Sequence, residues 1–136
     1  VGFGNSQIIP VLVGGYNLKA NSTYLVEQPE IHLHPRAQSE LGDFFLDLYK
    51  KNIQTIVETH SEHMILRLQQ HIAKGLIPPD DIIFYYIYAK ENEKCIVPLR
   101  VDENGYFIDE WPQGFFSEKL EEAKLLSKIR FQKELE

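Results

Sequence analysis

Two short apolar runs, each followed at once by acidic and imidazole side chains, constrain the fold of this chain more than any other feature. The first run covers Thr23–Glu27 and leads into Q-P-E-I-H-L-H-P, and the second covers Ile53–Glu58 and leads into T-H-S. The first run is continuous rather than alternating, which predicts a strand that is buried on both faces. Because α/β proteins bind ligands beyond the carboxyl ends of their strands, the polar residues predict a site there.

Helical patterns follow both runs. Apolar residues recur at helical spacing from about Pro35 to Lys51, and proline is well suited to the first position of that helix. A second helix is expected over Ser61–Ala73 and is ended by Gly75. Strand, helix, strand and helix joined by short connections predict a parallel βαβ arrangement.

The opening residues Val1–Gln7 predict a glycine-containing loop, because Gly2 and Gly4 permit backbone angles that other residues avoid. A helix is expected to begin at the end of this loop, with a polar side chain as its cap and Pro10 in its first turn. The chain does not begin with methionine, so we expect it to be part of a longer protein.

The pattern changes after residue 81. Ile82–Ala89 is aromatic and β-branched, which predicts a strand, and Lys94–Val101 is expected to be its hairpin partner. Asp102–Gly105 has the composition of a turn, and a short strand is expected over Tyr106–Ile108. Trp111–Phe116 is expected to be a compact aromatic loop, and a last helix is expected to begin at Ser117.

The fold class predicted from these patterns is α/β. We expect a parallel sheet with flanking helices, extended by an antiparallel β-hairpin and a C-terminal helix. The expected division is residues 1–79, which carry the polar motifs, and residues 80–136, which form a hairpin and helix extension.

Composition narrows the function classes. The net charge is −6, which argues against a broad nucleic-acid footprint because such surfaces need clustered lysine and arginine. Cys95 is the single cysteine and cannot form an internal disulfide, so a reducing compartment is expected. No apolar run is long enough for a membrane span, and we expect a cytoplasmic protein.

The acidic residues that follow the strands favour phosphate chemistry. A carboxylate at the end of a buried parallel strand binds Mg²⁺ directly or through water, and a neighbouring acid orients an attacking water. Glu27 and Glu30 follow the first strand, and Glu58 and His60 end the second. The alternative for a single strand is a loop whose acids cap backbone amides, but two strands with the same ending make that alternative weaker.

These motifs resemble the second half of an ABC-type P-loop ATPase head, and more specifically the AAA-family ATPases related to the OLD (overcoming lysogenisation defect) and chromosome-maintenance ATPases. Val1–Gln7 resembles the signature loop, and Tyr24–Glu30 resembles the Walker B strand followed by H-L-H-P as the D-loop. Ile56–Ser61 resembles the switch-histidine strand. The resemblance covers residues 1–67 and implies the C-terminal part of a P-loop NTPase fold.

The resemblance implies a role for each matching residue on the strand ends. Glu27 matches the Walker B acid, which implies Mg²⁺ binding through water, and His60 matches the switch histidine beside the γ-phosphate. Gln28 stands where the usual catalytic glutamate does, and an amide can hold a water but cannot take its proton. Either hydrolysis is slow or Glu30 serves as the base.

The resemblance also implies that the signature and D-loop residues bind nucleotide. Gly4 matches a signature glycine, while Gly2 stands where the motif has serine, so Ser6 is the candidate for the hydroxyl contact to phosphate. Gln7 in the signature loop and His34 in H-L-H-P complete the implied nucleotide-binding set. Backbone N–H groups at the following helix N-terminus are a further phosphate-binding feature across a dimer.

The sequence contains no G-x-x-x-x-G-K-[ST] loop. In the family this Walker A loop precedes the signature, so the resemblance implies that the intact protein supplies it and that ATP and Mg²⁺ are its cofactors. The resemblance further implies a homodimer that sandwiches two ATP, with a role in DNA maintenance or anti-phage defence and contacts to DNA or an effector through other regions. The chain alone is expected to bind ATP weakly or not at all and to be inactive.

Two other functions are open from the residues alone. His32 and His34, with Glu58, His60 and His63, are possible ligands of a divalent metal in a hydrolase. The third function is a non-catalytic partner-binding module, whose docking surface would be the aromatic residues of the tail. Alternatively these aromatics form a core, and we expect most of them to be buried. They are Tyr85, Tyr86, Tyr88, Trp111, Phe115 and Phe116.

Overall fold

A computed structural model describes residues 3–91 and 93–109, with side chains from residue 6 onward. The chain divides into two compact units, which are described separately. The first comprises Val1–Ile82 together with Asp102–Tyr106, and the second comprises Ile83–Val101 together with Phe107–Glu136. None of the helices in the described residues is long and apolar enough to cross a membrane.

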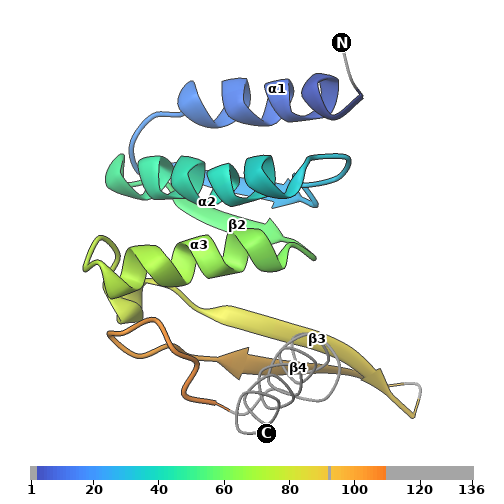
Figure 1. Cartoon of the computed structure of the whole chain (residues 1–136), viewed down its shortest axis with the longest axis vertical. Coiled ribbons are helices and arrows are strands. Elements are labelled where there is room, and N and C mark those ends of the chain that lie inside the picture. The colour runs from blue at the N-terminus through green and yellow to red at the C-terminus, as the bar shows by residue number, and fades with distance from the viewer. Residues whose placement is uncertain (1–2, 92, 110–136) are drawn as a thin grey trace, which may run out of the picture. The chain divides into compact units, whose positions relative to one another are not determined.

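A parallel βαβ arrangement forms the first unit, as predicted. Strands β1 (Thr23–Glu27) and β2 (Gln54–Glu58) pair in parallel, with Thr23 opposite Gln54 and Glu27 opposite Glu58. Helix α2 (Pro35–Lys50) connects them, and α3 (Glu62–Ala73) follows β2. Figure 1 shows the three helices α1, α2 and α3 on one side of the two strands.

The ends of α2 and α3 follow local sequence signals. The predicted helix over residues 35–51 is confirmed to within one residue, with Pro35 in the first turn and Lys50 in the last. Ser61 is the N-cap of α3, and its hydroxyl accepts a hydrogen bond from the Met64 N–H at 3.2 Å. Gly75, with φ of +69°, follows the end of α3.

The core of the first unit lies between the helices and the inner face of the sheet. The Phe44 ring packs against two other aromatic rings. It meets Tyr16 edge-on, with 5.2 Å between the ring centroids, and Phe45 at a tilt, with 5.1 Å between the centroids. Leu48 has no exposed surface, and Met64 of α3 is 1% exposed. The core joins residues of β1, α2 and α3 with Ile53, which directly precedes β2: Val26, Leu41, Phe44, Phe45, Leu48, Ile53 and Met64.

The prediction that the first strand is buried on both faces is wrong for the described chain. Val26 is buried, but its neighbour Leu25 is 71% exposed, and Ile56 on β2 is 52% exposed. Successive side chains on a strand point to opposite faces of the sheet, and the helices cover the face that carries Val26. The continuous apolar run therefore presents one face to the core and leaves Leu25 and Ile56 on the other.

The expected opening loop is also wrong where the structure describes it. Helix α1 runs from Phe3 to Tyr16, so Gly4 and the residues up to Gln7 are helical, and Pro10 lies inside the helix rather than in its first turn. One glycine costs a helix about 1 kcal/mol relative to alanine. Ile8, Val11 and Leu12 of α1 pack against the core, and such tertiary contacts outweigh that cost.

Two glycines of α1 permit this packing. A Cβ on Gly15 would lie 2.5 Å from Cζ of Phe44, and one on Gly14 would lie 2.8 Å from the Tyr24 hydroxyl. The Tyr24 hydroxyl donates a hydrogen bond to the Val11 carbonyl at 2.8 Å. The glycine pair therefore lets α1 approach the α2 and β1 side chains closely.

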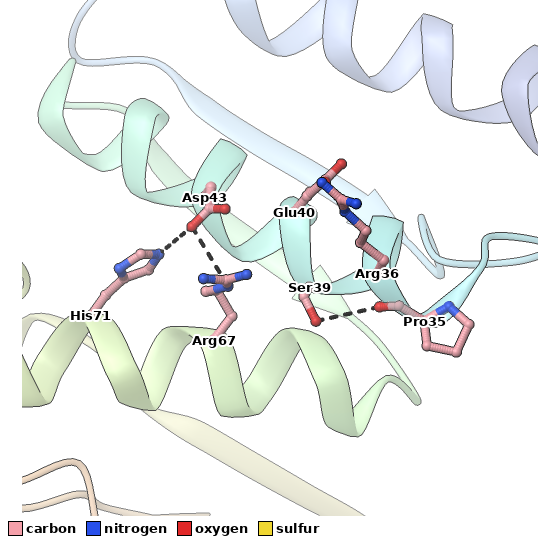
Figure 2. Close-up of polar contacts among 7 residues, drawn as sticks. All are labelled: Pro35, Arg36, Ser39, Glu40, Asp43, Arg67 and His71. Atoms are coloured by element: carbon pink, nitrogen blue, oxygen red, sulfur yellow. Dashed lines mark hydrogen bonds and ion pairs between the residues drawn. The ribbon is translucent and has the colours of Figure 1, made fainter.

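A buried polar contact links α2 to α3 (Figure 2). His71 is 5% exposed, and its Nε2 lies 2.8 Å from Oδ1 of Asp43. The Arg67 guanidinium approaches the same oxygen at 3.8 Å. Nδ1 of His71 is buried without a hydrogen-bond partner in the part of the chain that the structure describes, so Asp43 is the main polar contact of this ring.

Replacing Asp43 with alanine should lower the free energy of unfolding by about 1–3 kcal/mol, because it leaves a buried imidazole unpaired. Urea denaturation of the 136-residue chain measures this change. Glu40→Ala is the matched control on the same helix, since its pair with Arg36 is exposed and should contribute about 0.5 kcal/mol or less. Equal effects of the two substitutions would contradict the structural role of Asp43.

Two further segments complete the first unit. The short 3-10 helix Pro79–Asp81 follows α3, and the Tyr49 hydroxyl donates to Oδ2 of Asp81 at 2.5 Å. The predicted turn at Asp102 is confirmed, with its carboxylate accepting from the Asn104 and Tyr106 N–H groups. Gly105 has φ of +79°, and its carbonyl accepts from Nε2 of Gln69 on α3 at 2.6 Å.

An antiparallel hairpin forms the second unit, as predicted. Strand β3 (Phe84–Lys90) pairs with β4 (Glu93–Leu99), with Phe84 opposite Leu99 and Lys90 opposite Glu93. Instead of the expected strand at 106–108, a single bridge joins Val101 to Phe107. The hairpin has an exposed apolar face, which carries Tyr85, Ile87 and Ile96. The expectation that most tail aromatics are buried is therefore wrong for Tyr85, whereas Tyr86 and Tyr88 are half-buried.

An exposed ion pair closes the described part of this unit. The Arg100 guanidinium donates to both carboxylate oxygens of Asp109, at 3.1 Å and 2.8 Å, and the Arg100 N–H also donates to Oδ2. The side-chain hydrogen bond lowers the pKa of Asp109 from 3.8 to about 2. The expected loop Trp111–Phe116 and the helix expected from Ser117 lie outside the described residues.

Candidate functional site

The ends of β1 and β2 bring the two predicted motifs to one edge of the sheet. Glu27 is in register with Glu58, so the last residues of both strands are neighbours. Helices α2 and α3 begin just beyond that edge, and Figure 1 shows the N-terminus of α1 on the same side of the unit. The edge therefore combines acidic side chains with helix N-termini, which carry partial positive charge.

Gln28 turns the chain away from β1 and contacts the end of β2. Its backbone N–H donates to the Glu58 carbonyl at 2.8 Å, which extends the strand pairing by one bond. Its side-chain Nε2 donates to Oε1 of Glu58 at 3.2 Å. The residue has φ of +43°, a left-handed conformation that is uncommon for a side-chain-bearing residue. The amide is thus placed between the two strand ends.

Glu30 connects the loop after β1 to the loop after β2. Its carboxylate Oε1 accepts the His60 backbone N–H at 2.6 Å, and the residue is 7% exposed. The second oxygen, Oε2, is buried and has no hydrogen-bond partner among the residues that the structure describes. A buried polar oxygen is costly without a hydrogen bond, so the bond from the His60 N–H holds Glu30 against the loop that carries this histidine.

The H-L-H-P segment makes the transition into α2. His32 has φ of +62°, and His34 is the N-cap of the helix, with its Nδ1 accepting from the Arg36 N–H at 3.3 Å. Both side chains belong to exposed residues. His34 therefore uses Nδ1 to cap α2. It is an exposed residue at the same edge of the sheet as Glu27.

Two positions that sequence reasoning did not assign to the site join its loops. Gln38, in the first turns of α2, donates from Nε2 to the Leu33 carbonyl at 3.0 Å and accepts the Ser61 hydroxyl at Oε1 at 2.7 Å. Ser61 is 3% exposed. The capping role of Ser61 is readable from sequence, but a single glutamine in a helix gives no comparable signal.

The signature-like residues lie at the beginning of α1. Gly4, Ser6 and Gln7 occupy its first two turns, while Gly2 lies outside the described residues. Ser6 and Gln7 are exposed. Gly4–Gln7 are helical instead of forming the expected phosphate-binding loop. Their backbone N–H groups are therefore oriented as in a helix.

The histidines and carboxylates do not converge on a metal. No group of three or more His, Cys, Asp or Glu side chains within residues 3–91 and 93–109 is arranged to hold an ion. The histidine-ligated hydrolase therefore has no support from the described geometry. Glu27, an exposed carboxylate at the strand end, fits Mg²⁺ better, because that ion keeps several waters and is bound by one or two carboxylates together with substrate phosphates.

Two family models match separate parts of the chain. Residues 1–65 match the family model of an AAA ATPase domain, and residues 77–126 match a family described as a protein of unknown function, DUF3696. Searches of curated proteins and of solved structures gave no match. The first match covers slightly less than half of the chain and supports a relationship to AAA-family ATPases.

Proposed function

We propose that this chain is the signature and Walker B part of an ABC-like ATPase head. The observation that carries the proposal is the joined edge, where Gln28 contacts Glu58 and Glu30 accepts the backbone N–H of His60. The match of residues 1–65 to an AAA ATPase domain supports it. The exposed sheet face with Leu25 and Ile56 also supports it, since a P-loop NTPase sheet is covered on both faces.

We assign a role to three side chains of this edge. Glu27 would hold Mg²⁺ through water, and the ion would supply charge neutralisation for the phosphates of ATP. The His60 imidazole donates a hydrogen bond to the γ-phosphate and stabilises the charge that develops in the transition state. The Gln28 amide holds the water that attacks the γ-phosphorus, while the bond to the leaving ADP oxygen breaks.

The rate of hydrolysis depends on which group accepts the proton of the attacking water. Gln28 has no basic atom, so it positions the water without activating it. Glu30 is the base that the sequence predicts as the alternative. Its Oε1 is occupied by the His60 N–H and its Oε2 is buried, so we assign Glu30 to holding the loop and propose slow intrinsic hydrolysis.

The phosphate cradle and the partner come from outside this chain. The sequence lacks a Walker A loop, so we propose that the intact protein supplies it and that two heads close around two ATP molecules. Gly4, Ser6, Gln7 and His34 are the residues we propose to face the nucleotide of the opposite head. A role in DNA maintenance or phage defence rests on the resemblance of the motifs alone.

Calorimetric titration with Mg-ATP tests the proposal. The intact protein should bind Mg-ATP with micromolar affinity, about −8 kcal/mol, whereas the 136-residue chain alone should give no saturable heat. The intact protein carrying Glu27→Gln should bind Mg-ATP more weakly but keep its affinity for metal-free ATP. Micromolar binding by the chain alone, or full Mg-ATP affinity of the Glu27 variant, would contradict the assignment.

A further inference from the structure

We infer that Gln38 is a positioning residue that joins the loop after β1 to the loop after β2, so that the two loops move together. The inference rests on the proposed function, because the residue whose placement is controlled is His60. Gln38 touches neither the predicted metal ligand Glu27 nor the water-holding Gln28 in any described hydrogen bond, and it acts through the backbone and Ser61.

The geometry uses both ends of one amide. Nε2 of Gln38 donates to the Leu33 carbonyl at 3.0 Å, which belongs to the H-L-H-P segment. Oε1 accepts the Ser61 hydroxyl at 2.7 Å, and Ser61 follows His60 directly. The amide supplies these two bonds from two different atoms, a donor nitrogen and an acceptor oxygen. Leucine at this position would lose both bonds, and glutamate would lose the donor.

The loop after β1 needs such support because its backbone is strained. Gln28 and His32 both have positive φ, at +43° and +62°, which side-chain-bearing residues adopt only when the surroundings enforce it. Inside the loop, the Ile31 and Leu33 N–H groups donate to the Gln28 and Glu30 carbonyls at 3.3 Å and 3.0 Å. The Gln38 amide adds the bond that anchors the far end of this loop to α2.

A second hydrogen bond also joins the two loops, so that they are connected at two places. Glu30, near the middle of the first loop, accepts the His60 N–H at 2.6 Å, and Ser61 returns the connection through Gln38. Ser61 is also the N-cap of α3, so the second loop is fixed to a rigid helix on one side and to α2 on the other. A displacement of H-L-H-P is therefore transmitted to the His60 backbone through two independent hydrogen-bonded links.

Hydrogen exchange and turnover of the intact protein test the inference with Gln38→Leu, Gln38→Glu and the matched control Ser39→Ala. Ser39 is the next residue of α2, and its hydroxyl donates only to the Pro35 carbonyl within the described contacts. Gln38→Leu should speed amide exchange at His60 and Ser61 by about 10-fold or more, because the bonds that limit local opening are lost. Gln38→Glu should fall between Gln38→Leu and wild type, and Ser39→Ala should exchange like wild type.

In the same variants, kcat for ATP hydrolysis should fall with the exchange effect while KM changes less, because His60 contributes to the transition state more than to ground-state binding. Unchanged exchange at His60 in Gln38→Leu would overturn the inference. A uniform rise in exchange along the whole chain would also overturn it, because that result assigns Gln38 to general stability. If the intact protein proves not to hydrolyse ATP, the proposed function fails, and the local exchange result still decides the role of Gln38.

Discussion

The intact protein carrying Gln28→Glu should hydrolyse ATP about 100-fold faster than the wild type, because a positioned general base contributes about 10²–10⁴-fold to such reactions. Gln28 already contacts Oε1 of Glu58 at 3.2 Å, so the new carboxyl would face a second carboxylate. A carboxylate at position 28 could take the proton of the attacking water, which the Gln28 amide cannot. Steady-state release of inorganic phosphate measures the effect.

Glu30→Gln is the comparison that separates a base from a structural acceptor. An amide oxygen still accepts the His60 N–H, so this variant should keep turnover within about threefold of wild type if Glu30 only holds the loop. Glu30→Ala removes the acceptor and should reduce turnover further than Glu30→Gln. A loss of 100-fold or more in Glu30→Gln, with no gain in Gln28→Glu, would assign the base to Glu30 instead.

Replacing Phe44 with alanine should lower the free energy of unfolding by about 3–5 kcal/mol, the largest stability effect we expect from a single core substitution. Phe44 is 4% exposed and packs its ring against Tyr16 and Phe45. It also fills the space beside Gly15, so its removal opens a cavity where α1, α2 and the core meet. Chemical denaturation of the 136-residue chain, followed by circular dichroism, measures the change.

Leu66→Ala is the matched control for this substitution. Leu66 lies on α3 and is 47% exposed, so the same kind of truncation should cost well under half as much. A cost for Phe44→Ala no greater than that for Leu66→Ala would show that α1 does not close the core as described. If Phe44→Ala disrupts only the packing of α1, the helical circular dichroism signal of α2 and α3 should remain.

The parallel register explains why both motifs lie at one edge of the sheet. Glu27 and Glu58 are 31 residues apart in the chain but are paired neighbours at the sheet edge. The helix between two parallel strands returns the chain to the end where both strands begin, so neighbouring strands finish at the same opposite end and the residues that follow them converge. The convergence of Gln28 with Glu58, and of Glu30 with His60, is a consequence of that topology.

The sequence by itself determined the order and nearly all the limits of the elements that carry the site. The bounds of β1, α2 and α3 were predictable because proline, serine and glycine act on the backbone within a few residues of where they stand. The α/β fold class and the convergence of the two strand ends at one edge of the sheet followed from the same local signals. Charge and spacing also indicated which side chains would gather there.

Only the tertiary structure decided what those side chains touch. The exposure of Leu25, the helical state of Gly4 and the engagement of Glu30 by the His60 N–H depend on residues distant in sequence. The bridge from Gln38 to Leu33 and Ser61 is of the same kind. Helix and strand signals act over a few neighbours, whereas the partner of a buried polar atom is chosen by how separate elements pack, and no local pattern records that choice.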